Sequence, residues 1–383
     1  MTHAVALILV TLVTICTAST NAQTIRSGEL WPDSDGIHIN AHGGGILFHE
    51  GTYYWFGEHK SADTSRALVG IRVYTSTDLT SWTNAGVALA VSDDPMSEIV
   101  SGCVIERPKV LYNQANDTFV MWFHLEIKGH GYNAARSGVA VSDSPTGPFT
   151  YLGSVRPNPA RFPITISDDL RERAFKAPRA PETPTPGQTK PQISDRLFIR
   201  DIYGGHMARD MTLFLDDDGT AYHVFASEDN FTLHIAELDD TFTRHTGRYE
   251  RVLIGGHREA PALFKREGRY HLITSGCTGW APNAAEHHVA DSIWGPWTST
   301  GNPCTGDDAD LTFRSQSTFV LPVQGKRDAF VFMGDRWTPE TPIDGRYVWL
   351  PIAFDDAGTP TIEYLEEWNP GDHWADISPG GAP

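Results

Sequence analysis

The sequence predicts an all-β protein that folds as a single five-bladed β-propeller. The first observation is a strand–turn–strand template that recurs five times, at intervals of roughly 50–70 residues. The second is a further apolar strand after each hairpin, which brings each repeat close to the four strands of a propeller blade. The third is the composition, with 40% hydrophobic and 11% aromatic residues, 35 Gly and 25 Pro. This composition favours a turn-rich β protein over a helical one.

Each copy of the template opens near a polar residue, continues as an apolar strand, turns at Gly, Asp or Asn, and returns as a strand rich in aromatic and β-branched residues. The first strands of the five hairpins cover residues 42–48, 106–112, 209–215, 258–264 and 315–321. The returning strands cover 53–58, 119–124, 221–225, 269–274 and 330–335. The third strands begin at 73, 139, 234, 288 and 349.

The propeller geometry predicts where chemistry takes place. The innermost strands of all blades surround one central channel, so residues at the same end of those strands converge although they are distant in sequence. The residues that open the predicted inner strands are His42, Glu106, Asp210, Glu259 and Gln316. Three carboxylates, an imidazole and an amide around one funnel are suited to general acid/base chemistry on a neutral substrate.

One segment interrupts the repeats. Residues 156–200 are rich in Pro, Arg and Lys and show little periodicity. So long a structureless connection in a compact fold is either a disordered or surface loop, or a lid that folds over the funnel. The sequence leaves both alternatives open.

The N-terminus has the pattern of a secretory signal peptide. Residues 4–15 form an apolar run too short to span a bilayer, and small residues follow it up to Ala22. We therefore expect residues 1–22 to be a signal peptide and residues 23–383 to be one propeller domain. The mature protein is expected to be secreted, either outside the cell or into a periplasm.

The formal net charge is −18, from 48 acidic and 30 basic residues. Nucleic acids and anionic membranes would be repelled by such a protein, so neither is an expected partner. A neutral plant or microbial polysaccharide or oligosaccharide is compatible with this charge, which also serves solubility.

Three cysteines remain after the expected cleavage site. Export makes a disulfide between Cys277 and Cys304 one alternative, and isolated thiols are the other. No Cys or His spacing indicates a zinc site. Asn116-Asp117-Thr118 and Asn230-Phe231-Thr232 have the pattern of N-glycosylation sequons, which matter only in a eukaryotic secretory pathway.

The order of motifs resembles glycoside hydrolase family 43, and more closely its subgroup that contains exo-β-1,3-galactanases. The motifs lie at blade starts or on the adjacent strand and cover nearly all of the mature chain. They are residues 41–45 (AHGGG), 54–58 (YWFGE), 106–110 (ERPKV), 209–211 (RDM) with 217–219 (DDG), 259–261 (EAP), 278–280 (TGW) and 315–317 (SQS).

The resemblance implies roles for the residues at the channel. Glu259 matches the general acid of an inverting mechanism, and Asp210 matches the aspartate that tunes and orients it. Most family members carry an Asp-Pro pair with the base aspartate at the first inner strand, whereas this chain has Ala41-His42 there. The subgroup shares that loss, and the resemblance implies that Gln316 contacts the attacking water. It would pass a proton through its imidic acid form or share that task with Glu106. The other alternative is that Gln316 only hydrogen-bonds a sugar hydroxyl.

The same resemblance implies a set of sugar-binding residues. Glu106 is expected to bind hydroxyls of the terminal sugar, and Glu58 is expected to accept another hydroxyl. Tyr132 and Thr278 match binding positions of the subgroup. Trp280 and Trp337 are of the type that stacks on a pyranose face. His42 is expected either to line the channel, with a role in substrate binding or in holding a water or ion, or to make a structural hydrogen bond.

The sequence therefore predicts a secreted inverting hydrolase that releases a non-reducing terminal sugar, most readily galactose from β-1,3-galactan. The alternatives are an α-L-arabinofuranosidase or galactofuranosidase of the same family, and a non-catalytic glycan-binding propeller. No cofactor and no catalytic metal are expected, although a structural calcium ion on the propeller axis stays open.

Overall fold

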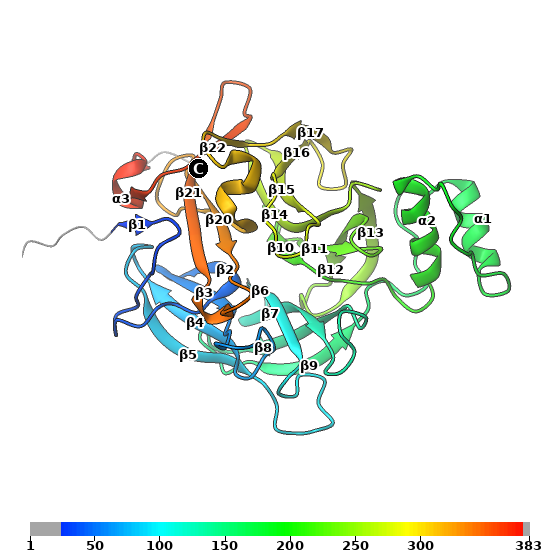
Figure 1. Cartoon of the computed structure of the whole chain (residues 1–383), viewed down its shortest axis with the longest axis horizontal. Coiled ribbons are helices and arrows are strands. Elements are labelled where there is room, and N and C mark those ends of the chain that lie inside the picture. The colour runs from blue at the N-terminus through cyan, green and yellow to red at the C-terminus, as the bar shows by residue number, and fades with distance from the viewer. Residues whose placement is uncertain (1–23, 378–383) are drawn as a thin grey trace, which may run out of the picture.

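The computed structural model describes residues 24–377, so the expected signal peptide, residues 1–22, lies outside the described residues. Five sheets surround a common centre, and the predicted five-bladed propeller is confirmed (Figure 1). Blades 1 to 4 each contain four antiparallel strands, and the sheet of blade 5 contains five. The inner strand of each blade neighbours the inner strands of the blades beside it, and the last inner strand contacts the first.

The strand bounds follow the predicted repeats. Blade 1 contains β2 (His42–His49), β3 (Thr52–Glu58), β4 (Gly70–Ser76) and β5 (Thr83–Ala90). Blade 2 contains β6 (Val104–Asn113), β7 (Thr118–Glu126), β8 (Arg136–Ser142) and β9 (Thr150–Val155). Blade 3 contains β10 (Met211–Leu215), β11 (Ala221–Ser227), β12 (Thr232–Leu238) and β13 (His245–Val252). Blade 4 contains β14 (Arg258–Arg266), β15 (Arg269–Gly276), β16 (Glu286–Ala290) and β17 (Thr298–Gly301). Blade 5 contains β19 (Gln316–Pro322), β20 (Phe330–Arg336), β21 (Arg346–Phe354), β22 (Pro360–Glu363) and β18 (Cys304–Thr305), which pairs with β22 in parallel.

Two-residue turns form two of the inner hairpins. Glu50 and Gly51 between β2 and β3 have φ values of 46° and 80°, and Glu267 and Gly268 between β14 and β15 have 49° and 77°. Positive φ at both central residues is the requirement of a type I′ turn, whose twist matches that of the strands it joins. The glycine in the second position therefore allows a tight turn in each hairpin at the position that the sequence predicted.

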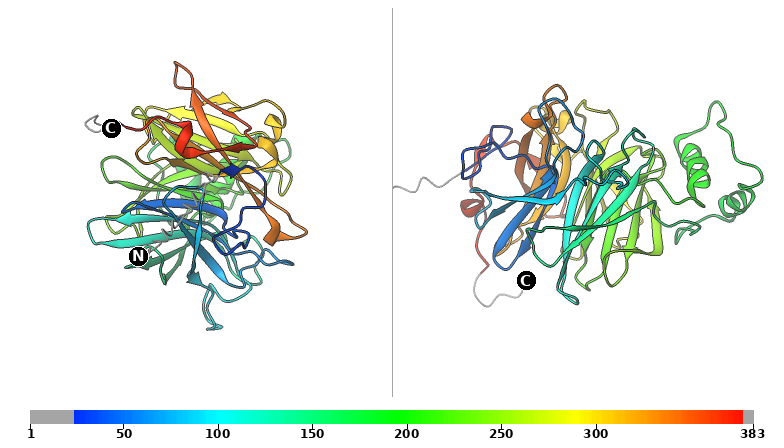
Figure 2. Two further views of the ribbon diagram at one scale, coloured as in Figure 1. Left: turned by 90° about the vertical axis from the view of Figure 1, so that its left-hand side faces the viewer. Right: turned by 90° about the horizontal axis from the view of Figure 1, so that it is seen from below.

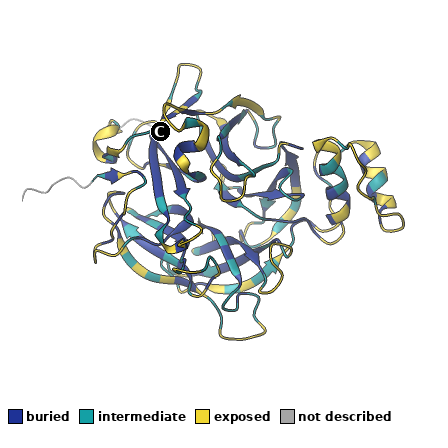
Figure 3. Cartoon of the chain, in the orientation of Figure 1, coloured by how far each residue is buried: buried dark blue, intermediate teal, exposed yellow. Residues whose placement is uncertain are grey.

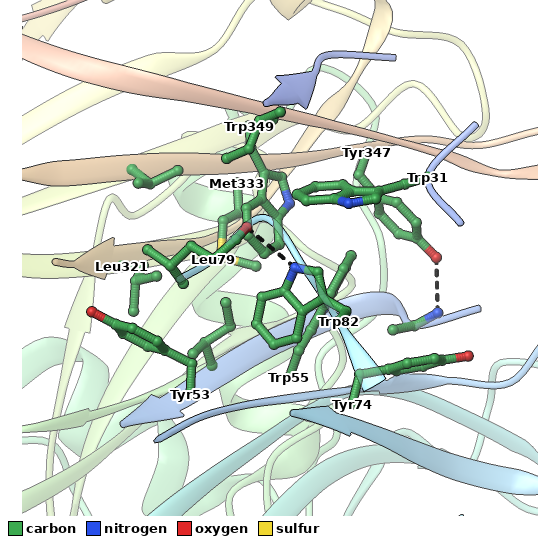
Figure 4. Packing of buried hydrophobic residues seen from close by; sticks show 14 of the residues in the cluster. Trp31, Tyr53, Trp55, Tyr74, Leu79, Trp82, Leu321, Met333, Tyr347 and Trp349 are labelled. Atoms are coloured by element: carbon green, nitrogen blue, oxygen red, sulfur yellow. Dashed lines mark hydrogen bonds between the residues drawn. The ribbon is translucent and has the colours of Figure 1, made fainter. Parts of the chain in front are cut away.

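The two ends of the described chain meet at blade 5. β1 (Ile25–Arg26) pairs with β23 (Glu367–Trp368), next to the short helix α3 (Pro370–His373). Beneath this junction an aromatic cluster joins blade 1 to blade 5, with Trp55 and Trp349 4.6 Å apart between ring centroids (Figure 4). The Tyr347 hydroxyl accepts a hydrogen bond from the Ala41 amide at 2.8 Å. Burial of these rings against each other holds the first and last blades together.

The segment at 156–200 is not structureless, and that prediction was wrong. It contains helices α1 (Asp168–Lys176) and α2 (Lys190–Asp201), which begin at caps provided by Ser167 and Thr189. Both lie beside blade 3 at the rim of the propeller (Figures 1 and 2). Leu170, Ala174 and Phe198 pack into the core formed by blades 2 and 3, while the outer faces of both helices are exposed (Figure 3). The helices therefore cover the side of blade 3, not the funnel.

Two short 3₁₀ segments complete the regular structure, Ala309–Arg314 before β19 and Pro342–Asp344 before β21. None of the helices within residues 24–377 has the length and apolar character that crossing a bilayer requires.

Cys103, Cys277 and Cys304 are all free thiols, so the Cys277–Cys304 disulfide alternative is wrong for this structure.

Candidate active site

The site lies where the inner strands begin, and irregular strand pairing shapes it. The register shifts after His42 in β2, after Glu106 in β6, after Glu259 in β14 and after Ser317 in β19. Gly43, Arg107 and Ala260 have φ values of 60°, 57° and 53°, as expected at bulges. A regular strand would direct consecutive side chains to opposite faces. The bulge in β6 instead lets both Glu106 and Arg107 face one cavity.

That cavity has a volume of about 260 Å³. It is lined by Glu58, Glu106, Arg107, Tyr132, Asp210, Glu259, Gly279, Trp280, Gln316 and Trp337. The cavity thus brings together every residue that the sequence singled out except Thr278 and His42. Strands from four blades and the loops beside them contribute to it.

Glu259 is the carboxyl group suited to proton donation. Burial, reinforced by the charge of Asp210, raises its pKa to about 7, against the opposing effect of Arg107. Its Oε1 accepts a hydrogen bond from Gln316 Nε2 at 2.9 Å, and its Oε2 accepts one from Asn230 Nδ2 at 2.9 Å. A carboxyl group with this pKa is substantially protonated near neutral pH and can serve as a general acid.

Arg107 organises the opposite wall of the cavity. Its Nη2 contacts the Gln316 side-chain oxygen and also donates to Asp210 Oδ2 at 3.0 Å. Its backbone N–H donates to Glu58 Oε1 at 2.9 Å. Because a guanidinium group can only donate, it fixes the Gln316 amide with its oxygen toward Arg107 and its nitrogen toward Glu259. Arg107 therefore sets the orientation of the Gln316 amide.

Glu106 is held as a carboxylate. Burial alone would raise its pKa, but the hydrogen bond and charge of His124, with Lys60 and Tyr132, lower it to about 2. The Tyr132 hydroxyl donates to Glu106 Oε1 at 2.7 Å, and His124 Nδ1 donates to Oε2 at 3.1 Å. Such a carboxylate accepts hydrogen bonds from sugar hydroxyls and is too acidic to keep a proton.

Glu106, His124 and Asp210 have ligand atoms within 4.8 Å of one another, a spacing that a metal ion could bridge. The donor set does not fit calcium, which takes six to eight oxygen ligands. Burial would lower the pKa of His124, but hydrogen bonds and charge from Glu106 and Glu126 raise it to about 9. An imidazolium has no free lone pair for a metal, and Asp210 already forms an ion pair with the Arg107 guanidinium.

The remaining binding candidates divide into two groups. Glu58, whose pKa burial raises, forms a buried ion pair with Lys60 beneath the cavity. The rings of Trp280 and Trp337 meet edge to face at 5.8 Å between centroids and form the aromatic wall. Trp280 is set apart from the buried tryptophans of the core, since 49% of its surface is exposed, and Trp337 is partly buried.

Thr278 and His42 are not among the lining residues. The Thr278 hydroxyl donates to the Ala281 carbonyl and orders the loop that carries Gly279 and Trp280. His42 is fully buried, and its ring packs between Trp337 and Tyr347 at 5.6 Å from each. Neither ring nitrogen of His42 has a hydrogen-bond partner within residues 24–377, so the structural hydrogen bond considered for it is also absent there.

Among the residues that sequence reasoning missed, Arg107 contacts Gln316 and Asn230 contacts Glu259. Arg107 lies within the 106–110 motif, but strand alternation would have placed it away from Glu106. Asn230 lies in a turn that carries no signal other than the sequon pattern. In both cases the signal that could have found them is backbone geometry with positive φ, which a single sequence does not display.

A five-bladed propeller whose axial cavity gathers a carboxyl group with a raised pKa, further carboxylates and two tryptophans belongs to the class of glycoside hydrolases built on propellers. The family model described as glycosyl hydrolases family 43 matches residues 196–360. Together with a solved relative that is 52% identical and fully covered by this chain, this match shows the family. The chain belongs to glycosyl hydrolase family 43.

Three of the similar solved structures are named for activity on β-1,3-linked galactose. A family 43 β-1,3-galactosidase, solved with galactodeoxynojirimycin, shares 52% identity over 90% of this chain and 100% of its own, with a TM-score of 0.86. An exo-β-1,3-galactanase from Phanerochaete chrysosporium, solved with β-1,3-galactotriose, shares 32% identity over 93% of this chain and 71% of its own, with a TM-score of 0.74. An exo-β-1,3-galactanase from Clostridium thermocellum shares 34% identity over 90% of this chain and 66% of its own, with a TM-score of 0.73. A search of curated proteins found no match.

Proposed function

We propose that this hydrolase releases galactose from the non-reducing end of β-1,3-galactan with inversion at the anomeric carbon. The observation that carries the proposal is the position of Glu259, an acid with a pKa of about 7, in a cavity that accommodates little more than one sugar. The names of the solved relatives support galactose as that sugar. A small cavity also supports attack at a chain end, because an internal unit would need an open groove.

In this proposal Glu259 protonates the glycosidic oxygen while water attacks the anomeric carbon from the opposite face. Asp210 keeps the acid protonated by its negative charge. Glu106 and Tyr132 bind hydroxyls of the terminal sugar, Glu58 accepts another, and Trp280 and Trp337 stack on its apolar face. Thr278 acts only by ordering the loop of Trp280, and we assign no substrate contact to His42.

Gln316 is proposed to hold the attacking water, and this role requires a rearrangement. Inverting enzymes keep the acid and the opposing group about 6.5–9.5 Å apart to leave room for water, whereas Gln316 Nε2 lies 2.9 Å from Glu259 Oε1. The entering sugar would have to replace that hydrogen bond. Because Arg107 fixes the amide oxygen, we favour Gln316 as a residue that positions water. Glu106, whose pKa is about 2, would pass the proton of that water on to solvent and would not keep it.

Product release tests the proposal. Wild type and Gln316→Ala are incubated with β-1,3-galactan, with an arabinofuranosyl-bearing polymer and with a galactofuranosyl-bearing polymer. Galactose from the first polymer alone, lost in the variant, is the expected result. Pentose or galactofuranose release would establish one of the family's other activities, and binding without release from any polymer would establish a glycan-binding propeller.

We also propose that residues 1–22 direct export and that the substrate is met outside the cytoplasm. A polysaccharide substrate supports this, since polymers of that size are met outside the cell membrane. N-terminal sequencing of protein recovered from the exported fraction tests it, with a mature start at residue 23 as the expected result. Neither a cofactor nor a catalytic metal enters the proposed reaction.

A further inference from the structure

The turn between β11 and β12 has a strained backbone. Glu228, Asp229 and Asn230 have consecutive φ values of 54°, 52° and 64°. Asn and Asp tolerate this left-handed region, but Glu does not favour it, so the turn persists only where other contacts hold it. Strained backbone of this kind often lies at functional sites. The contacts of these three side chains show what the turn positions.

The insertion anchors the first two residues of that turn. Glu228 is fully buried and accepts two hydrogen bonds from Arg251, at 2.7 and 2.9 Å. Arg251 also donates to Asp195 of helix α2 at 3.0 Å. Arg200, near the end of the same helix, donates to Asp229 at 2.9 Å. Helix α2 is therefore connected to both residues that precede Asn230.

Asn230 connects the turn to the acid. Its Nδ2 donates to Glu259 Oε2 at 2.9 Å, while Gln316 Nε2 donates to Oε1. The Asn230 side-chain oxygen is buried and has no partner within residues 24–377, so the bond to Glu259 alone orients the amide. With one donor on each oxygen, the plane of the carboxyl group is determined.

We infer that Asn230 is a positioning residue for Glu259, and that helix α2 of the insertion keeps it in place through the turn at Glu228 and Asp229. The inference rests on the proposed function for the identity of the acid. It gives the insertion a role at the rim of blade 3 that is distinct from covering the funnel. It also means that the sequon at Asn230 presents an amide nitrogen already engaged with Glu259.

The hydrogen bond from Asn230 favours the ionised form of Glu259, so its loss extends the acid's protonated range to higher pH. The other charged or titratable groups that face Glu259 are Asp210 before β10, Arg107 in β6, Cys277 after β15 and Arg258, which precedes Glu259 in β14. None of these changes in an Asn230 variant, so a shift in the pH profile reports on Asn230 alone.

Two substitutions separate position from charge. Asn230→Gly removes the hydrogen-bond donor to Glu259, and glycine adopts the φ value of 64° at this position without steric strain. We expect kcat to fall roughly tenfold with KM little changed, since the acid loses its alignment. Asn230→Asp adds a like charge, and we expect the alkaline limb of kcat/KM to move upward by about one pH unit. Unchanged kcat and an unchanged limb in both variants would overturn the positioning role.

The contribution of helix α2 is tested by a double-mutant cycle. Asp195→Ala with Arg200→Ala removes both connections without changing net charge, and we expect a loss in kcat of a few-fold. In the Asn230→Gly background the same pair should cause no further loss, because the helix acts through Asn230. The matched control is Glu172→Ala with Lys176→Ala, which removes an ion pair of helix α1. Equal losses in both backgrounds, or the same loss in the control, would refute the part assigned to α2.

A direct titration keeps this test independent of the substrate. The ¹³C carboxyl resonance of Glu259, assigned by its absence in Glu259→Gln, is followed over pH in wild type and Asn230→Asp. An upward movement of the midpoint supports the contact even if wild type releases no sugar, in which case the proposed function fails alone. Coincident titrations would overturn the inference whatever the activity.

Discussion

Glu259→Gln is expected to abolish turnover and to stabilise the fold at alkaline pH. Burial and the charge of Asp210 raise the pKa of Glu259 from its ordinary value of 4.5 to about 7. A group with a higher pKa in the folded state takes up protons on folding, so stability is fully present below pH 4.5 and is lost as pH rises through 7. At about 1.4 kcal/mol per pH unit, the ionised carboxylate costs the folded state about 3 kcal/mol above pH 7.

The glutamine side chain never ionises and so avoids that cost. It does forfeit one interaction, because an amide has a single acceptor oxygen and a nitrogen that only donates, so it cannot accept from both Asn230 and Gln316 as the two carboxyl oxygens do. A lost hydrogen bond costs about 1 kcal/mol, which leaves a net gain of about 2 kcal/mol above pH 7 and a rise in Tm of roughly 2–4 °C. Below pH 4.5 the gain disappears, since wild-type Glu259 is then neutral in both states.

Thermal unfolding from pH 4 to 9 and galactose release from β-1,3-galactan measure the two effects. We expect turnover to fall by at least about 100-fold. Glu29→Gln, at an exposed carboxyl group, is the control and should change neither activity nor the pH dependence of Tm. If the difference in Tm between Glu259→Gln and wild type is the same at pH 5 and pH 8, the raised pKa is refuted. Retention of activity would refute the assignment of the acid.

Two further outcomes follow from the structure. Trp280→Ala should raise KM roughly 3- to 10-fold with little change in kcat or Tm, because the half-exposed ring offers a stacking surface and no core packing; a loss of Tm by several degrees would show that the ring is structural. Cys103 and Cys304, whose pKa values burial raises to about 11 and about 12, should react with a thiol reagent only after unfolding. Reductant should leave Tm unchanged, and a reductant-dependent Tm would contradict the free thiols.

The fold was predictable because each blade repeats the same local signals. Period-two strands, Gly turns and an apolar third strand give the same interpretation five times, so an error in one copy is corrected by the others. The insertion was not predictable in this way because it occurs once. Its prolines suggested a loop, yet Pro191 lies in the first turn of α2, where a missing backbone N–H costs nothing. Prolines within a segment therefore do not exclude helices when they fall at helix starts.

The candidate site shows the same division between repeated and unique features. The residues that open the inner strands recur at equivalent positions, and the sequence pointed to them for that reason. The side chains of Arg107 and Asn230 reach the site because their residues have positive φ values of 57° and 64°. In a regular strand or turn these side chains would point in another direction. These two residues hold the amide of Gln316 and the carboxyl group of Glu259 in one arrangement. The residues proposed to react could thus be predicted from the sequence, whereas Arg107 and Asn230, which orient two of them, depend on backbone geometry that only the structure supplies.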